Sequence, residues 1–247
     1  MYESYNHPKY VHPDPIEFLY AFSSSEDREI VGFLASALAY GRVTQILNSV
    51  SRVLRVMGTS PHQFLLQSSW ASFQEMFAGF SHRFATGEEI SALLVGAGGV
   101  INRYGSLQAA FLSGYSETDE TILPALSHFV SVVMEAAPSS PGHLLPQPER
   151  GSACKRLNLF LRWMVRRDAV DPGEWRQIPP SRLIIPLDTH MHRVGLNLGF
   201  TGRKQGDMKT ALEITNGFKA MVPEDPVRYD FVLTRLGVWG KTQWLER

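Results

Sequence analysis

Apolar residues recur at helical spacing along most of the chain. In Glu26–Tyr40, "EDREIVGFLASALAY", one face of the expected helix carries Ile30, Phe33, Leu34, Ala37 and Leu38. The segment "RVTQILNSVSRVLRVMG" at 42–58 repeats this spacing. Segments that alternate between apolar and polar residues, as half-buried strands do, are weak by comparison. The pattern therefore predicts a mainly α-helical protein.

Helix start signals stand in front of several of these segments. "DPIE" at Asp14–Glu17 combines an N-cap aspartate, a proline at the first helical position and a glutamate at the third. "TGEE" at Thr86–Glu89 is a capping-box pattern that opens a helix to about Tyr104. Further helices are expected over Thr121–Ala137, over Asp207–Val222 and over "DPVRYDFVLTRLG", which starts Asp-Pro and ends on Gly237.

Two sections rich in helix breakers divide the pattern. They are "PSSPGHLLPQPERGS" at Pro138–Ser152 and the proline-rich Asp171–Pro186. Between them "ACKRLNLFLRWMVRRD" predicts an amphipathic helix, with Leu157, Phe160, Leu161, Met164 and Val165 on one face and Lys155, Arg162 and Arg166 on the opposite one. We expect two helical lobes with a cleft between them. Residues 1–41 and 151–247 form one lobe, and residues 42–150 form a helical-bundle lobe.

Charge is balanced overall but not locally. The 247 residues include 24 Lys or Arg and 24 Asp or Glu, which argues against a uniformly basic nucleic-acid binder. Between Arg150 and Lys204, however, there are 11 basic and 4 acidic residues, a surplus of seven positive charges. The positive charge is thus concentrated in the segment that follows the first breaker section.

Cysteine content and hydropathy further restrict the class of protein. The single cysteine, Cys154, excludes an internal disulfide and any four-cysteine zinc or iron–sulfur site within one chain. The N-terminal sequence lacks the pattern of a signal peptide, and no apolar run approaches the roughly 20 residues that span a bilayer. We expect a cytoplasmic monomer with no membrane association, no metal and no cofactor.

The most informative stretch is "LIIPLDTHMHRV" at Leu183–Val194. As a strand end, it would present His190 and His192 to a metal, as in metal-dependent hydrolases. That reading is disfavoured because the 55 residues after His192 contain no further histidine. Alternatively, Leu183–Leu187 is an extended core segment and Asp188 caps a helix over Thr189–Leu198. An N-cap aspartate needs no catalytic explanation by itself.

A longer span adds a family resemblance. "PLDTHMHRVGLNLGF" resembles the "VDTH-x-x-RV-x-x-R" segment of helix-hairpin-helix DNA glycosylases, the endonuclease III superfamily. "DREIVGFLASALAYGRVTQILNSV" is similar to the helix pair near the N-terminus of that superfamily. The chain as a whole is similar to a bacterial family of unknown function that carries "CKRLNLFLRWMVR" and "DPVRYDF". The resemblance implies a helix-hairpin-helix glycosylase-like fold.

The chain departs from the superfamily pattern at several positions. The hairpin "LPGVGxK" is replaced by "LLPQPERGSACK", with Pro146 and Gly151 as the hairpin residues and Lys155 at the place of the lysine of bifunctional members. Lys155 and Asp188 lie 33 positions apart, a spacing similar to that of the archaeal oxidised-guanine glycosylases. Leu38 stands near where many relatives have glutamine, and the iron–sulfur loop is absent.

The resemblance implies a DNA glycosylase, with AP lyase activity, that removes an oxidised or damaged base from double-stranded DNA. Asp188 would stabilise the positive charge that builds on the sugar, and Lys155 would attack the sugar carbon and form a Schiff base. DNA-binding residues would be Gly151, Arg156, Arg162, His190 and Arg193. The alternatives are a non-catalytic helical nucleic-acid-binding protein and a helical protein that does not bind DNA.

Overall fold

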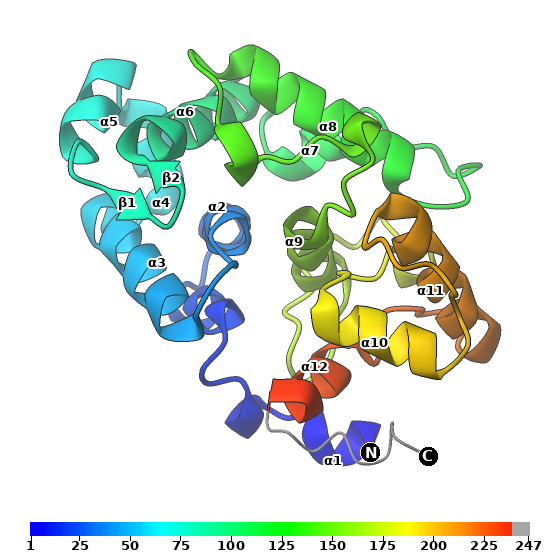
Figure 1. The fold of residues 1–247 in the computed structure, drawn as a ribbon. Helices are drawn as coiled ribbons and strands as arrows, with labels where there is room; N and C mark the ends of the chain where they lie inside the picture. Colours follow the sequence, from blue (N-terminus) through cyan, green and yellow to red (C-terminus); the bar gives the residue numbers. More distant parts are fainter. Residues whose placement is uncertain (239–247) are drawn as a thin grey trace. The chain divides into compact units, whose positions relative to one another are not determined.

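The computed structural model describes residues 1–238, and the described chain is mainly α-helical. It separates into two compact units. We call residues 1–12, 119–123 and those from 147 onward the motif-bearing unit, and residues 13–118 and 124–146 the bundle unit. Helices of each unit are visible in Figure 1. The prediction of a mainly helical fold is confirmed, whereas the likeness to a glycosylase fold stays a prediction.

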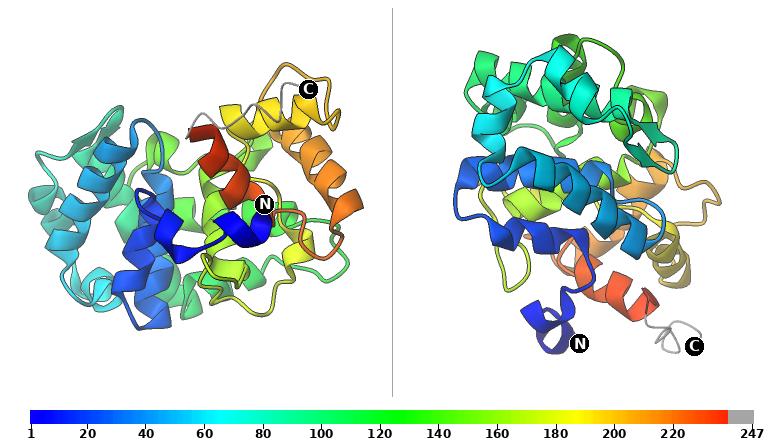
Figure 2. Two further views of the ribbon diagram at one scale, coloured as in Figure 1. Left: turned by 90° about the horizontal axis from the view of Figure 1, so that it is seen from below. Right: turned by 90° about the vertical axis from the view of Figure 1, so that its left-hand side faces the viewer.

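The bundle unit contains seven α-helices, one 3₁₀-helix of seven residues, one short 3₁₀-helix and a small hairpin among the described residues. In chain order these are η2 (Pro15–Ala21), α2 (Ser25–Ala37), α3 (Val43–Met57), α4 (Pro61–Gln67), α5 (Trp70–Met76), β1 (Ser81–His82), β2 (Ala85–Thr86), α6 (Gly87–Tyr104), α7 (Leu107–Leu112), α8 (Leu123–Ala136) and η3 (Gly142–Leu144). The strands pair antiparallel, with Ser81 opposite Thr86 and His82 opposite Ala85. Figure 2 shows α2 beside α3, the helix that follows it in the chain.

The core of the bundle unit forms around α2. This helix starts at an N-cap, Ser24, whose side chain accepts a hydrogen bond from the Asp27 N–H, and it contacts η2, α3, α4 and α7. Phe33 on α2 meets the edge of Phe129 on α8, with ring centroids 5.8 Å apart. Glu29 is also buried, and its carboxylate accepts hydrogen bonds from the Leu107 and Gln108 N–H groups, which caps α7.

Among the described residues, the motif-bearing unit contains four α-helices after residue 147, two short helices before residue 13, and two short 3₁₀-helices at 148–150 and 180–182. Its elements are α1 (Tyr2–Tyr5), η1 (Pro8–Tyr10), η4 (Pro148–Arg150), α9 (Lys155–Val165), η5 (Pro180–Arg182), α10 (Thr189–Asn197), α11 (Met208–Met221) and α12 (Asp230–Val238). Helix α10 packs against α11 and α12, and the views in Figures 1 and 2 show α10 and α11 side by side. Eight of the eleven residues of α9 are buried, and Lys155, Arg156 and Leu159 are partly exposed.

Most predicted helices are confirmed, with small differences at their ends. The capping box of Thr86 and Glu89 opens α6, which ends at Tyr104 as expected. Asp207 caps α11. The "DPIE" segment starts a 3₁₀-helix, capped by Asp14, in place of an α-helix. In "DPVRYDFVLTRLG" the α-helix begins at Asp230, because turns occupy the preceding residues 226–229.

The grouping of the N-terminal residues differs from the expected lobes. Residues 13–41 were expected beside the motif-bearing segment, but they fall in the bundle unit. The physical reason is that the apolar residues of α2 are buried against η2, α3, α4 and α7 of that unit. Within residues 1–238, no helix combines the length and apolar character needed to cross a membrane.

Candidate functional site

The "LIIPLDTH" segment delivers Asp188 to the start of a helix. Leu183–Leu187 is extended and buried, and the Ile185 N–H donates to the Thr215 hydroxyl of α11 at 3.0 Å. Asp188 then caps α10, where its Oδ1 accepts the Met191 N–H at 2.8 Å. The carboxylate thereby stabilises a free N–H group at the positive end of the helix. Its second oxygen, Oδ2, remains available for another partner.

Lys155 is the first residue of α9. The preceding chain turns sharply, with Gly151 at φ +76° and Cys154 at φ +46°, both in the left-handed region. The Gly151 carbonyl accepts the Met208 N–H of α11 at 3.1 Å, and the Ser152 hydroxyl accepts the Cys154 N–H at 3.2 Å. The turn is therefore held against α11 and fixes where α9 begins.

Lys155 and Asp188 are brought together by these two helix starts. The Lys155 Nζ lies 3.7 Å from the Asp188 Oδ2, although the residues are 33 positions apart in the chain. The side chain of Lys155 is 35% exposed and that of Asp188 is 20% exposed. Both groups can therefore be reached from solvent while most of their surface is covered by protein.

A buried carboxyl lies behind this pair. Asp230, the first residue of α12, is 3% exposed and accepts a hydrogen bond from the Arg162 guanidinium. Burial raises the pKa of Asp230 to about 6, and repulsion from Asp188 adds to the rise, while Arg162 and Lys155 oppose it. Asp230 is thus electrostatically coupled to both members of the Lys155–Asp188 pair.

The remaining charges behind the pair form a buried network around two arginines. Arg162 also donates to Asp171, through Nε at 3.2 Å and Nη2 at 3.1 Å. Arg166 binds Asp171, and it forms ion pairs at 2.9 Å with Asp168 and with Asp225. Burial opposes the charge of Arg166, but the attraction of these three aspartates outweighs burial and raises the pKa of the guanidinium. We call Arg162, Arg166, Asp168, Asp171, Asp225 and Asp230 the arginine–aspartate network.

The burial of Arg162 corrects one predicted DNA contact. Its side chain is 3% exposed, and Asp171 and Asp230 occupy the guanidinium, so Arg162 is not available to a phosphate in this structure. The helical period placed Arg162 opposite the apolar face of α9, where a contact with DNA was expected. The loop before η5 and the start of α12 cover that face instead, and their aspartates neutralise the arginine.

The other predicted DNA contacts all lie in the motif-bearing unit. Gly151 and Arg193 are exposed, and Arg156, next to Lys155 on α9, is partly exposed. His190 on α10 is partly buried, and its ring lies so close to Gly237 of α12 that a Cβ there would sit 2.9 Å from Nδ1. These positions leave Gly151, Arg156 and Arg193 accessible, whereas His190 contributes to the packing of α10 on α12.

The alternative metal site depended on a strand end that the chain does not form. His190 and His192 lie on α10, where side chains two positions apart point in divergent directions. The His192 Nε2 is 2.8 Å from the Arg203 carbonyl oxygen. Within the described residues 1–238, no group of three or more His, Cys, Asp or Glu side chains is arranged to hold a metal ion.

Sequence reasoning missed the aspartates of the arginine–aspartate network. A buried arginine requires a charged partner. The only sign of such partners in the sequence was the clustering of aspartates in 168–171 and 225–230. Leu38, which stands near the glutamine position of the resembled glycosylases, is fully buried in the bundle unit. Leu38 therefore packs in the core.

Fold and site together define a mainly helical protein in which a lysine and an aspartate meet at the N-terminal ends of two helices. The chain belongs to the family described as "Protein of unknown function (DUF2400)", whose sequence model matches residues 14–239. The match includes Lys155, Asp188 and all members of the arginine–aspartate network. Comparisons with curated proteins and with solved structures found no match.

Proposed function

We propose that the protein is a DNA glycosylase with AP lyase activity that removes an oxidised or otherwise damaged base from double-stranded DNA. The observation that carries the proposal is the 3.7 Å distance between the Lys155 Nζ and the Asp188 Oδ2. The pair joins the two residues that the resemblance to helix-hairpin-helix glycosylases assigns to the chemistry. The partial exposure of both side chains supports access of a sugar to the pair.

Each residue has a defined role in the proposed reaction. When the glycosidic bond breaks, its electron pair leaves with the base and positive charge builds on the sugar. The Asp188 carboxylate, fixed by its bond to the Met191 N–H, stabilises that charge. The Lys155 ammonium gives a proton to the departing base, and the resulting amine attacks the anomeric carbon. Opening of the sugar ring then forms a Schiff base, from which the 3′ phosphate can be eliminated. Before the proton transfer, the ion pair with Asp188 holds the ammonium near the point of attack.

The damaged base must leave the helical stack before either residue can act. Unstacking and unpairing cost a few kcal/mol, least for a damaged or mismatched base, and this difference contributes to selectivity. Arg156 on α9 and Arg193 on α10, the helices that begin at Lys155 and just after Asp188, offer contacts to the phosphates that flank the extruded nucleotide. Because these contacts to phosphates are electrostatic, DNA binding should weaken as salt concentration rises.

The test uses duplex oligonucleotides that each contain one damaged base, with borohydride added to trap a Schiff base. We expect wild-type protein to form a covalent adduct with at least one duplex and Lys155→Gln to form none. Asp188→Asn should lower the rate of base release on the order of 10²-fold or more, because Asn keeps the helix cap but lacks the charge. Both variants should still bind DNA.

Matched controls are available in the same unit. Asp207 also caps a helix and pairs with a cation, Arg203, so Asp207→Asn removes an equivalent charge away from Lys155. Lys209 is exposed on α11, and Lys209→Gln removes an equivalent positive charge. Both controls should retain the activity. Retained DNA binding without an adduct on any duplex would favour a non-catalytic nucleic-acid-binding protein, and unchanged activity in Asp188→Asn would refute the mechanism.

A further inference from the structure

The bundle unit has a polar pocket that the proposed chemistry does not use. The exposed face of α3 carries Gln45, Asn48 and Arg52 at helical spacing, and the hairpin β1–β2 lies opposite this face. Between them is a pocket of about 260 Å³. Its lining consists of polar or basic side chains: Gln45, Asn48, Ser49, Arg52, Ser81, His82 and Arg83. No carboxylate contributes to this lining.

Within residues 1–238, no neighbouring carboxylate neutralises the two arginines of this pocket. Arg52 donates to the Gly79 carbonyl at 3.3 Å and lies over the Phe80 ring, 5.4 Å from its centroid. Arg83 lies over the Phe84 ring at the same distance. Among the described residues neither arginine forms an ion pair. Two guanidinium groups with free N–H donors and no acidic partner match the charge and geometry of a phosphate.

The floor of the pocket is held by a histidine. His82 is 2% exposed, and its Nε2 is 3.1 Å from the Tyr40 carbonyl oxygen. Since a carbonyl can only accept, Nε2 carries a hydrogen, and Nδ1 shares a second hydrogen bond of 2.8 Å with the Ser49 hydroxyl. The Tyr40 hydroxyl donates to the His82 carbonyl at 2.8 Å. These three bonds fix the hairpin beside α3, so the pocket exists before any ligand binds.

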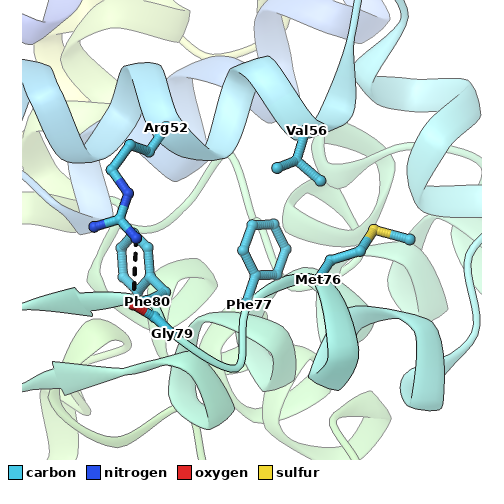
Figure 3. Close-up of a pocket in the computed structure, with 6 residues that line it drawn as sticks. All are labelled: Arg52, Val56, Met76, Phe77, Gly79 and Phe80. Atoms are coloured by element: carbon cyan, nitrogen blue, oxygen red, sulfur yellow. Dashed lines mark hydrogen bonds between the residues drawn. The ribbon is translucent and has the colours of Figure 1, made fainter.

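An apolar pocket adjoins the polar one and shares Arg52. It measures about 110 Å³ and is also lined by Val56, Met76, Phe77, Gly79 and Phe80. Figure 3 shows Val56 of α3 facing Phe77 across this pocket, with the Arg52 guanidinium beside them over Phe80. Val56 is 39% exposed and Met76 is 44% exposed, so the pocket opens to solvent. A flat aromatic group can enter between the apolar walls and still contact a guanidinium.

We propose that these adjoining pockets, which we call the α3–hairpin groove, bind a nucleotide. Arg52 and Arg83 hold its phosphate, and its base enters the apolar pocket between Val56 and Phe77. Phe84, at the turn of the hairpin, is 73% exposed and offers a surface on which the neighbouring base of a single strand can stack. The ligand is thus a free mononucleotide or a nucleotide within single-stranded nucleic acid. Binding here does not require glycosylase chemistry.

Binding measurements on the full chain test the proposal with four probes: inorganic phosphate, a nucleoside, the matching nucleoside monophosphate and a short single-stranded oligonucleotide. We expect the monophosphate to bind more tightly than the nucleoside or inorganic phosphate, because only the monophosphate occupies both pockets. Arg52→Gln and Arg83→Asn should each weaken monophosphate binding at least tenfold. Asn suits position 83 because it tolerates the left-handed backbone at φ +55°.

The control variant is Arg55→Gln, which removes an exposed arginine from the same helix but outside the groove. It should change monophosphate binding less than twofold. Lys155→Gln and Asp188→Asn should also leave monophosphate binding unchanged, which separates this site from the proposed glycosylase site. Thermal unfolding confirms that each variant is folded. If Arg52→Gln disturbs the fold by releasing Phe80, Arg83→Asn carries the test alone, since its side chain is exposed.

The oligonucleotide distinguishes the two sources of the ligand. Tighter binding of the oligonucleotide, reduced roughly five- to a hundredfold by Phe84→Ala, identifies a strand of nucleic acid. Equal affinity for the monophosphate and the oligonucleotide identifies a free nucleotide. The proposal is overturned if no probe binds, if inorganic phosphate binds as tightly as the monophosphate, or if Arg55→Gln weakens binding as much as Arg52→Gln and Arg83→Asn do.

Discussion

Replacing Asp230 by Asn should change the pH dependence of stability in a defined direction. In the folded protein the pKa of Asp230 is raised by burial to about 6, from an ordinary value of 3.8. Between these two pH values the folded state therefore binds more protons than the unfolded state. Stability falls with rising pH wherever that is so. The contribution of Asp230 is fully present below pH 3.8 and is lost as the pH rises through 6.

The size of the effect follows from the two pKa values. One pKa unit corresponds to about 1.36 kcal/mol. Between pH 4.5 and pH 8, wild-type protein should lose about 2 kcal/mol of unfolding free energy through this one carboxyl. The variant Asp230→Asn does not lose this unfolding free energy, because the amide does not titrate. The free energy of unfolding of the variant, relative to wild type, should therefore rise by about 2 kcal/mol over this pH range.

Urea denaturation of both proteins at pH 4.5, 6 and 8 measures this difference. Glu120→Gln, which removes an exposed carboxylate of the same unit, controls for the loss of one acidic charge. The test uses only the change with pH of the difference in unfolding free energy between variant and wild type. Any pH-independent cost of placing an amide beside Arg162 therefore cancels. A difference that is flat with pH, or that falls as pH rises, would show that Asp230 does not titrate as its burial implies.

Two further perturbations test other parts of the structure. Glu29→Ala leaves the Leu107 and Gln108 N–H groups without their acceptor, and it should lower the unfolding free energy by about 1–3 kcal/mol in urea denaturation. The control Glu135→Ala, at an exposed position, should lower the unfolding free energy by less than about 0.5 kcal/mol. Equal effects of the two variants would contradict the capping role of Glu29. Burial raises the pKa of the Cys154 thiol to about 11, so alkylation by iodoacetamide at pH 8 should be about 100-fold slower in the native protein than in urea. Native and unfolded rates within tenfold of each other would show that the thiol is accessible.

The helices and the helix caps could be predicted from the sequence because their causes are local. Thr86 and Glu89 satisfy the N–H groups of the first turn of α6 regardless of what packs on that helix. Asp188 caps α10 for the same reason. The start of α12 could not be placed in this way, since Asp-Pro opens a turn as readily as a helix. Its first helical residue is Asp230, whose position depends on a distant partner, Arg162.

The burial of α9 depends on tertiary packing, which the spacing of apolar residues along the sequence does not predict. An apolar face shows that one side of a helix is covered, but a basic face does not show that the other side is free. Arg162 and Arg166 are covered by segments that follow α9 in the chain, and the aspartates of these segments satisfy the two cations. The α3–hairpin groove was missed for a related reason. Arg52 and Arg83 are 31 positions apart, and only folding places them at one pocket.

Asp188 and Asp230 show how burial separates the roles of two carboxyl groups that influence the same lysine. Asp230 is covered by protein and held by Arg162, so it can act on Lys155 only through the electric field. Asp188 retains one oxygen toward Lys155 and part of its surface toward solvent, so a substrate atom can reach it. A carboxylate that must stabilise a transient charge needs such access, whereas a carboxyl that only adjusts the local potential does not. If Lys155 performs chemistry, Asp188 is therefore the group that meets the substrate, and Asp230 influences both residues through its charge.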